Sequence, residues 1–468
     1  MSPRFRTVLI ACVLVAVAAA VIRTMVAGAD RPAGDFLRYE RAATLVARGE
    51  GALLYDEKER IAAHVWGDRK NLPEQGFRYA PGLAVAMAPL GALPPETAWP
   101  IWSGICAGLT ALGAGLAVAL AVRRLPPGTC PWLPVVAAVV PLYALYSENV
   151  MLGQMNCFAF GLSMAALWSL DGKCDRSAGL LAAGATLAKH IPVLLILWFL
   201  WQRRWKAALW GASGVALLFY LLPTAVLGPS THHALLSQWK AQEDHLVTEV
   251  GEAPGMKASN PSVVHVEGQS TKALLFRYLT PMPFFHLKDL KGGPEAGAGS
   301  KGILVNGGRD WGGATAFRLW LASMFVLLSL TVLATSPRPG EDPGAVALRF
   351  PLEAAMVLAA MVLVSPESRN PHFQVLAPAL AGLAAGLAAE TRRGGSWWGR
   401  AGMASLGALL VMIPTKFLLG RDGADRALAW GSIGGGGLLV FVALAWTLFR
   451  ERERSPVPGP AEPAAAAP

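Results

Sequence analysis

Long apolar runs are the feature that most constrains this sequence. Runs of about 20 mostly apolar residues, long enough for a helix to cross the hydrocarbon core of a bilayer, begin near Thr7, Ala98, Val150, Ala207, Ala314, Ala401 and Leu428. Because the chain is 54% hydrophobic and only 15% charged, with a mean hydropathy of +0.42, lipid must surround much of it. The sequence therefore predicts an all-α polytopic membrane protein.

Shorter apolar runs complete the predicted set of crossings. They begin near Pro131, Phe350 and His372, and their length suggests spans that lean on neighbours or end at functional loops. The run 178–201 contains Lys189 and Pro192 near its middle. Because proline lacks an amide donor and a lysine is costly in lipid, we predict two half-spans that form a hairpin with Lys189 at its tip. The total is about twelve crossings, between eleven and thirteen.

Basic residues lie in the short loops between these runs, which is the pattern of cytoplasmic loops in membrane proteins. With the N-terminus inside, one side holds Arg4, Arg6, Arg123, Arg124, Lys173, Arg176, Arg203, Arg204, Lys206, Arg338, Arg349, Arg392, Arg393, Arg400, Arg450, Arg452 and Arg454. The net charge of +10 is thereby explained without a nucleic-acid partner. We predict one transmembrane domain over residues 1–450, with outer segments at about 30–97 and 228–313, and a disordered cytoplasmic tail over 451–468 that is rich in Pro and Ala.

The ends of the first outer segment carry two further predictions. The first apolar run is predicted to be an uncleaved span, although a secretory signal cut near Ala29 is an alternative that also leaves Asp35 outside. Helical spacing over 36–48 and a short apolar run over 80–90 predict two helices that lie along the membrane surface or dip into it.

Composition and motifs narrow the class of site. The 5 cysteines have no C-x-x-C or Cys/His spacing, so neither a disulfide framework nor a zinc site is predicted. No Walker loop and no dinucleotide-binding glycine pattern occurs. No D-x-D pair occurs in the outer segments, and we expect no obligatory metal and no cofactor.

Asp35 is the first candidate for chemistry. It follows the first apolar run directly, where a lipid headgroup would meet water, and a carboxylate there could accept the proton of an acceptor hydroxyl. An N-cap of the next helix is the alternative interpretation, and the two roles are compatible.

Two further candidates border the predicted spans. Gln154 and Asn156 open the fourth span after the predicted outer turn 146–149, and paired amides there could orient sugar hydroxyls or phosphate oxygens; helix packing would explain them equally well. Lys189 is an ionisable residue inside an apolar run and suits a phosphate, whereas snorkelling to the interface is the alternative.

The last two candidates come from polar outer segments. Gln269 and Arg277 lie on an amphipathic patch, where Arg277 could bind a phosphate or simply be a solvated loop charge. Arg369 and His372 lie in the polar segment 365–373 between two short spans, where they could hold phosphate and donate or relay a proton, or belong to a structural turn set by Pro366 and Pro371. All these groups fall on the outer side of the predicted topology, which favours one external site.

The order of these motifs resembles a known family. An outer Asp after the first span, Leu54-Tyr55, Phe77-Arg78-Tyr79-Ala80-Pro81, Gly-Gln-x-Asn, Lys-x-x-Pro before Arg203-Arg204-Trp205, Gly268-Gln269-Ser270 with Arg277, and the segment 365–372 occur in this order. This set and order of motifs resembles that of the polyprenol-phosphate-mannose-dependent mannosyltransferases of glycosyltransferase family eighty-seven. The resemblance covers about residues 7–387, with Gly268 where the family usually has Asn.

The resemblance implies a GT-C fold, with an outer active site on the cytoplasmic membrane. It implies that Asp35 is the catalytic base, that Lys189, Arg277, Arg369 and His372 bind the donor phosphate, and that Gln154, Asn156, Gln269 and Tyr79 contact the sugar or headgroup. The implied partners are a lipid-linked sugar donor and a glycolipid or glycan acceptor, and the implied reaction is an inverting transfer of a hexose, mannose above all. A multi-span transporter or flippase is the alternative; transporters tend to bury ionisable residues near the bilayer midplane and to show repeated halves, and neither pattern is visible.

Overall fold

A computed structural model describes residues 34–56, 77–125, 129, 131–248, 268–280, 305, 310–337, 343–392 and 397–454. These residues are helical apart from turns, loops and one isolated bridge between Gly268 and Arg369. The predicted span that begins near Thr7, and the tail from Ser455 onward, lie outside the described residues. The all-α class is confirmed for the part of the chain that the structure describes.

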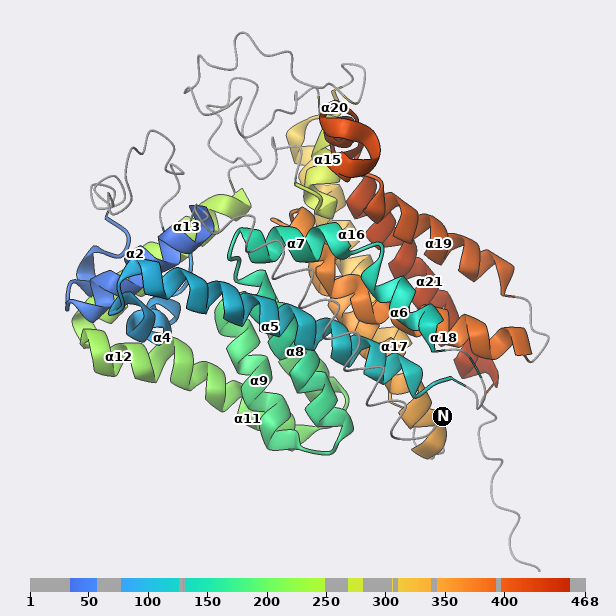
Figure 1. Ribbon diagram of the computed structural model, residues 1–468, viewed down its shortest axis with the longest axis horizontal. Helices are drawn as coiled ribbons and strands as arrows, with labels where there is room; N and C mark the ends of the chain where they lie inside the picture. Colours follow the sequence, from blue (N-terminus) through green and yellow to red (C-terminus); the bar gives the residue numbers. More distant parts are fainter. Residues whose placement is uncertain are drawn as a thin grey trace, which may run out of the picture.

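The predicted outer helices are present and pack on each other. Helix α2 (Gly34–Ala47) and helix α4 (Pro81–Gly91) lie together at one end of the molecule (Figure 1), with the short 3₁₀ helix η1 (Gly51–Leu53) after α2. Gly91 allows close approach, since a Cβ there would meet the backbone of Ala43. The apolar faces of the two helices are therefore buried against protein.

The next four helices correct one predicted boundary. They are α5 (Pro95–Val122), α6 (Trp132–Val139), α7 (Tyr143–Met151) and α8 (Asn156–Asp171). The predicted outer turn 146–149 is helical, and the chain turns instead at 152–155, so the span predicted from Val150 begins at Asn156. The predicted span near Pro131 becomes the pair α6 and α7, bent by 50°. The long apolar character of 150–170 hid the break, because hydropathy does not report a single residue with positive φ.

The predicted hairpin at Lys189 is confirmed. Helix α9 (Asp175–Ala188) ends at Lys189, and α10 (Val193–Trp201) begins after Pro192. The two helices run in opposite directions, because Arg204, just after α10, contacts Asp175, the first residue of α9, at 3.9 Å. The tip of the hairpin is therefore the segment 189–192, with α9 and α10 both leading away from it.

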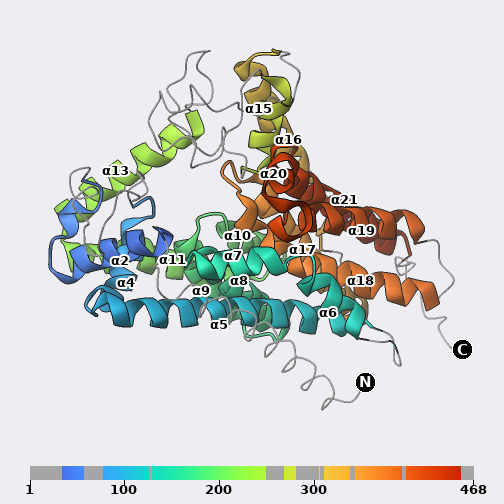
Figure 2. The same cartoon turned by 45° about the horizontal axis from the view of Figure 1, so that its top comes forward.

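The middle of the chain continues with helices of mixed character. Helix α11 (Trp205–Ala216) passes through a π turn, η2 (Leu217–Leu221), into α12 (Leu222–Leu227). The outer segment then holds α13 (Pro229–Thr248) and α15 (Thr271–Leu279). Both views place the beginning of α13 at the end of the molecule that holds α2 and α4 (Figure 2).

The C-terminal part packs around one central helix. It comprises α16 (Gly313–Ala334), α17 (Pro343–Val364), η6 (Asn370–Leu376), α18 (Ala377–Arg392), α19 (Trp398–Met412), α20 (Lys416–Ala429) and α21 (Ser432–Arg454). From Ala354 to Val364 every residue of α17 is buried, as expected of a stretch that is apolar on all sides. The helix that contains Phe350, where a short span was predicted, has 22 residues, and residues 451–454 of the predicted tail are helical.

The described residues contain fewer candidate membrane-crossing helices than the predicted total of about twelve. Five helices are long and apolar enough to cross a bilayer, or up to 7 if each bent pair is one span. Helices α8, α9 and α10 are too short for that criterion, because about 20 residues are needed. The total of about twelve stays a prediction.

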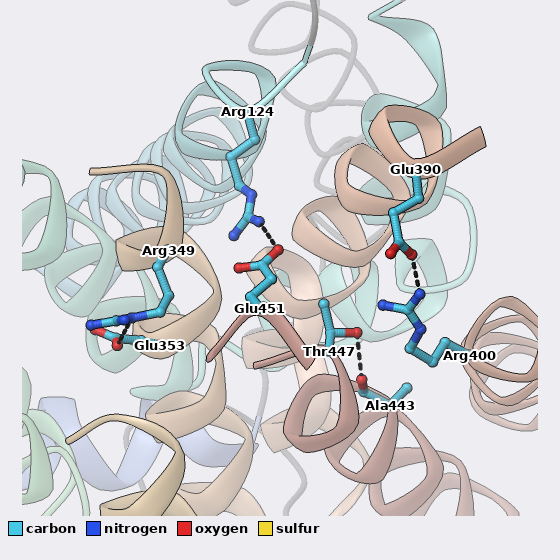
Figure 3. Close-up of polar contacts among 8 residues, drawn as sticks. All are labelled: Arg124, Arg349, Glu353, Glu390, Arg400, Ala443, Thr447 and Glu451. Atoms are coloured by element: carbon cyan, nitrogen blue, oxygen red, sulfur yellow. Dashed lines mark hydrogen bonds and ion pairs between the residues drawn. The ribbon is translucent and has the colours of Figure 1, made fainter. Parts of the chain in front are cut away.

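Arginine–carboxylate pairs gather at one end of the helices, and we call this the ion-paired end. Figure 3 shows three of them from different parts of the chain. The pairs are Arg123–Asp171, Arg124–Glu451, Arg204–Asp175, Arg349–Glu353 and Arg400–Glu390. Following the chain from these pairs to the other ends of α8, α9 and α17 leads to the segments 152–155, 189–192 and 365–370. These described basic loops therefore lie together at one end of the helices, as predicted.

Candidate active site

Asp35 is held at the start of α2 by aromatic packing. The neighbouring Phe36 lies 5.0 Å from Trp99 between ring centroids, and Tyr39, one turn later, lies 5.9 Å from Trp102. The side chain of Asp35 keeps 23% of its surface exposed. Its carboxylate accepts a hydrogen bond of 2.8 Å from Gln154. The carboxylate is therefore fixed in direction and still open on one side.

The turn between α7 and α8 aims Gln154 at Asp35. Gly153 has φ of +61°, a left-handed conformation that glycine adopts without steric cost. A Cβ at this position would lie 3.0 Å from Trp102 Nε1, and that indole nitrogen donates to the carbonyl of Gly153 at 2.8 Å. The glycine of the Gly-Gln-x-Asn motif is thus required by both conformation and space.

A chain of amide hydrogen bonds continues from Gln154 into the protein. Asn156 donates to Gln154 Oε1 at 2.5 Å and to Asn149 Oδ1 at 2.9 Å. Asn149 in turn donates to the carbonyl of Pro371 at 2.7 Å. Some of these hydrogen bonds join neighbouring helices, as the helix-packing interpretation predicts. The same hydrogen bonds connect Asp35 to Pro371, the residue before His372.

Lys189 and His372 meet at the centre of the site. Lys189 Nζ lies 3.4 Å from His372 Nε2, and His372 Nδ1 accepts the backbone N–H of Arg369 at 3.2 Å. Because Nδ1 accepts, a neutral His372 carries its proton on Nε2. Nε2–H and the ammonium of Lys189 are then two donors that face each other. An anion oxygen placed between them would accept both bonds.

An aromatic group closes the other side of Lys189. Lys189 Nζ lies 5.5 Å from the centre of the Tyr79 ring. The Tyr79 hydroxyl bonds to the Tyr39 hydroxyl at 2.9 Å, and Tyr55 donates to the Tyr79 carbonyl at 2.6 Å. Asp35 and Lys189 are therefore joined twice, once through the amide chain and once through the tyrosines of α2 and the 77–80 segment. We call the set Asp35, Tyr79, Gln154, Asn156, Lys189, Arg369 and His372 the polar site.

Gln269 and Arg277 are not part of this cluster. Both side chains have 0% of their surface exposed, so the interpretation of Arg277 as a solvated loop charge is wrong. Arg277 donates to the carbonyls of Leu428 at 2.9 Å and of Gly268, and Gln269 donates to Leu428 at 2.8 Å. The buried guanidinium meets backbone carbonyls that the end of α20 supplies.

The Gly-Gln-Ser motif instead supports the loop that carries Arg369. The N–H of Gln269 donates to the carbonyl of Ser368 at 2.7 Å, and Ser270 Oγ donates to Pro366 at 2.9 Å. Ser270 also caps α15 by accepting the N–H of Ala273 at 3.1 Å. The motif therefore positions the segment 365–372 from the side.

Several charged groups at the site were not predicted from sequence. Arg38 lies 3.4 Å from Asp35, and the i,i+3 spacing on a helix could have indicated it. Arg78, Glu243 and Glu367 interact electrostatically with one another, and no motif marks Glu243. Burial lowers the pKa of Arg78, against the effect of Glu367. Burial raises the pKa of Glu243 to about 7, helped by Glu367 and opposed by Lys189 and Arg78.

No group of three or more His, Cys, Asp or Glu side chains arranged to hold a metal occurs among the described residues. The expectation that the chain uses no metal stays a prediction.

Comparison with known proteins adds one family. A model described as glycosyltransferase family 87 matches residues 77–276. This segment contributes Tyr79, Gln154, Asn156 and Lys189 to the polar site, while Asp35, Arg369 and His372 lie outside it. Neither a curated protein nor a solved structure matches the chain.

Proposed function

We propose that this chain is a membrane glycosyltransferase that moves a hexose, mannose in our reading, from a polyprenyl-phosphate donor to a glycolipid or envelope glycan. The observation that carries the proposal is the double connection between a partly exposed carboxylate, Asp35, and the two facing donors, the ammonium of Lys189 and the Nε2–H of His372. The match of residues 77–276 to glycosyltransferase family 87 supports the class of reaction.

Asp35 acts as the general base. Its carboxylate takes the proton of an acceptor hydroxyl while that oxygen forms a bond to the anomeric carbon of the donor sugar. The bond from that carbon to the phosphate oxygen breaks on the opposite side, so configuration inverts. Gln154, which donates to Asp35 at 2.8 Å, keeps the free lone pairs of the carboxylate directed at the acceptor.

The donor phosphate binds between Lys189 and His372, with Arg369 beside them. The electron pair of the broken bond leaves on the polyprenyl phosphate, and fixed cations stabilise that charge as it develops. A neutralised phosphate leaves without an acid, so a base and cations complete the reaction without a metal. Tyr79 covers one face of the sugar. Gln269 and Arg277 lie outside the polar site and support the segment 365–372.

The site faces outward in the proposed topology. The ion-paired end carries the arginine-rich loops, which belong in the cytoplasm by the positive-inside rule. The polar site then opens at the outer face of the cytoplasmic membrane, where lipid-linked sugars and acceptors meet.

The test uses purified protein in lipid nanodiscs with polyprenyl-phosphate-mannose and a panel of mannosyl lipid acceptors. Asp35→Asn is expected to lower the transfer rate about 10³-fold, since it removes only the base. Asp422→Asn, the same change on an exposed part of α20, serves as the matched control and keeps full activity. Full activity of Asp35→Asn would show that another group accepts the proton.

A transporter would behave differently in the same material. It would move the intact lipid-linked sugar across the bilayer of a proteoliposome without forming a new glycosidic bond. That result with the wild type would replace the enzyme proposal.

A further inference from the structure

One face of α13 lies over the tip of the α9–α10 hairpin. The rings of Trp239 and His190 are 4.8 Å apart between centroids. Gln242 and Glu243 follow Trp239 by three and four positions, so they share its side of the helix. Nothing in the proposed chemistry uses these four residues, although His190 directly follows Lys189.

Three buried polar atoms of this group have no hydrogen-bond partner in the part of the chain that the structure describes. They are His190 Nε2, Trp239 Nε1 and Gln242 Oε1. Buried polar groups in native proteins are almost always bonded to protein or to a ligand or water. Three such atoms on two elements that touch each other therefore indicate an occupant with several polar groups of its own.

The group borders the polar site through Glu243. The carboxyl of Glu243 interacts electrostatically with Lys189 and Arg78, and with Glu367 and its neighbour Asp244. Burial raises the pKa of Glu243 to about 7, so near neutral pH it can accept or donate a hydrogen bond. An occupant seated against Trp239 would thus lie next to the phosphate-binding cations.

The chemistry of these atoms selects the occupant. Trp239 offers an N–H donor and an aromatic face, Gln242 offers an acceptor oxygen, and His190 offers either according to its tautomer. A phosphate only accepts hydrogen bonds, so Gln242 Oε1 and Glu243 would oppose it. A sugar ring has hydroxyls that both donate and accept, and C–H faces that pack on an indole.

We propose that Trp239, Gln242, Glu243 and His190 form a subsite for a neutral, hydroxylated sugar ring of one of the two lipid substrates. The proposal rests on the proposed glycosyltransferase function and adds the residues that recognise the sugar. The ring belongs either to the donor or to the acceptor, and binding measurements separate the two.

The experiment measures equilibrium binding without turnover, by native mass spectrometry of nanodisc-embedded full-length protein. The two probes are polyprenyl-phosphate-mannose for the donor and a neutral dimannosyl diacylglycerol for the acceptor. Gln242→Leu is expected to weaken one probe roughly fivefold, the effect of one lost hydrogen bond. Gln238→Leu, an exposed glutamine one turn before Gln242, is the matched control and leaves both probes unchanged.

Trp239→Phe protects the test against a folding defect of the first variant, because it keeps an aromatic ring and removes only the indole N–H. It is expected to weaken the same probe as Gln242→Leu by a similar factor. The weakened probe identifies the source of the sugar. Equal affinity of wild type, Gln242→Leu and Trp239→Phe for both probes, or no binding of either probe to wild type, would overturn the subsite.

The outcome is separable from that of the proposed function. Loss of transfer in Asp35→Asn with unchanged binding in Gln242→Leu would retain the enzyme and reject the subsite. Weakened binding in Gln242→Leu with no transfer by the wild type would retain the sugar site and reject the enzyme.

Discussion

The two ends of the helices handle charge in opposite ways. At the ion-paired end five arginines meet carboxylates, as Arg349 meets Glu353 at 2.5 Å and Arg400 meets Glu390 (Figure 3). At the polar site, Lys189 meets an imidazole and a tyrosine ring, and has no carboxylate within 4.0 Å in the described residues. At the polar site Arg38 pairs with Asp35 at 3.4 Å, but within the described part of the chain the ammonium of Lys189 is not neutralised by such a contact.

This difference separates structural charges from binding charges. A pair of opposite charges in a low-dielectric interior is tolerated because each ion replaces the water lost by the other. A cation beside a second hydrogen-bond donor is not stabilised by that donor until an anion binds between the two. Under the proposed function the same residue types serve packing at one end and substrate binding at the other, and three substitutions test this division.

The largest effect is expected at the ion-paired end. Arg400→Met removes the guanidinium that pairs with the buried Glu390, and loss of one partner of a buried pair typically costs about 3–5 kcal/mol. Denaturant unfolding in mild detergent measures the free energy of unfolding. The double variant Arg400→Met/Glu390→Leu should recover most of the loss. A single variant as stable as the double one would place Arg400 among the binding charges instead.

The next effect belongs to the polar site and to catalysis. Lys189→Met removes one cation from the departing phosphate, so kcat/KM should fall about 100-fold, with thermal stability unchanged or slightly raised. Steady-state transfer assays and a melting curve on the same preparation measure both quantities. Lys240→Met, an exposed lysine of α13, provides the comparison. Lost stability with retained transfer would reverse the roles that we give to the two ends.

The smallest effect concerns Glu243, whose carboxyl lies among Lys189, Arg78, Glu367 and Asp244. Its folded pKa of about 7 exceeds the ordinary 4.5, so between these values the folded chain binds more protons than the unfolded chain. Stability contributed by the protonated carboxyl is therefore lost as pH rises from about 5 to 7, by on the order of 1 kcal/mol.

Melting temperatures measured from pH 5 to pH 8 check this slope. Glu243→Gln should flatten it, whereas Glu50→Gln, an exposed glutamate near η1, should not. An identical slope in wild type and Glu243→Gln would mean that solvent reaches the carboxyl freely.

Local sequence patterns were sufficient for the helices that hold the catalytic candidate. Helical spacing over 36–48 predicted α2, and Pro192 with Lys189 predicted the break between α9 and α10. Both signals are local, because a proline removes its own amide donor and an amphipathic period is visible within one helix. Placing Lys189 beside His372, which is 183 residues later, rested on charge topology, and the structure supplied the contact.

Only the tertiary structure decided which polar residues are buried against backbone carbonyls and which belong to the polar site. Arg277 and Gln269 have the same chemistry as the residues of the polar site, yet the end of α20 covers them and supplies carbonyls for their bonds. Glu243 has no motif, and its pKa is raised first by burial in the packed structure and then by Glu367 from another element. Hydropathy and residue type determine that a segment lies in lipid or water, but the partners of a polar atom depend on how distant helices pack.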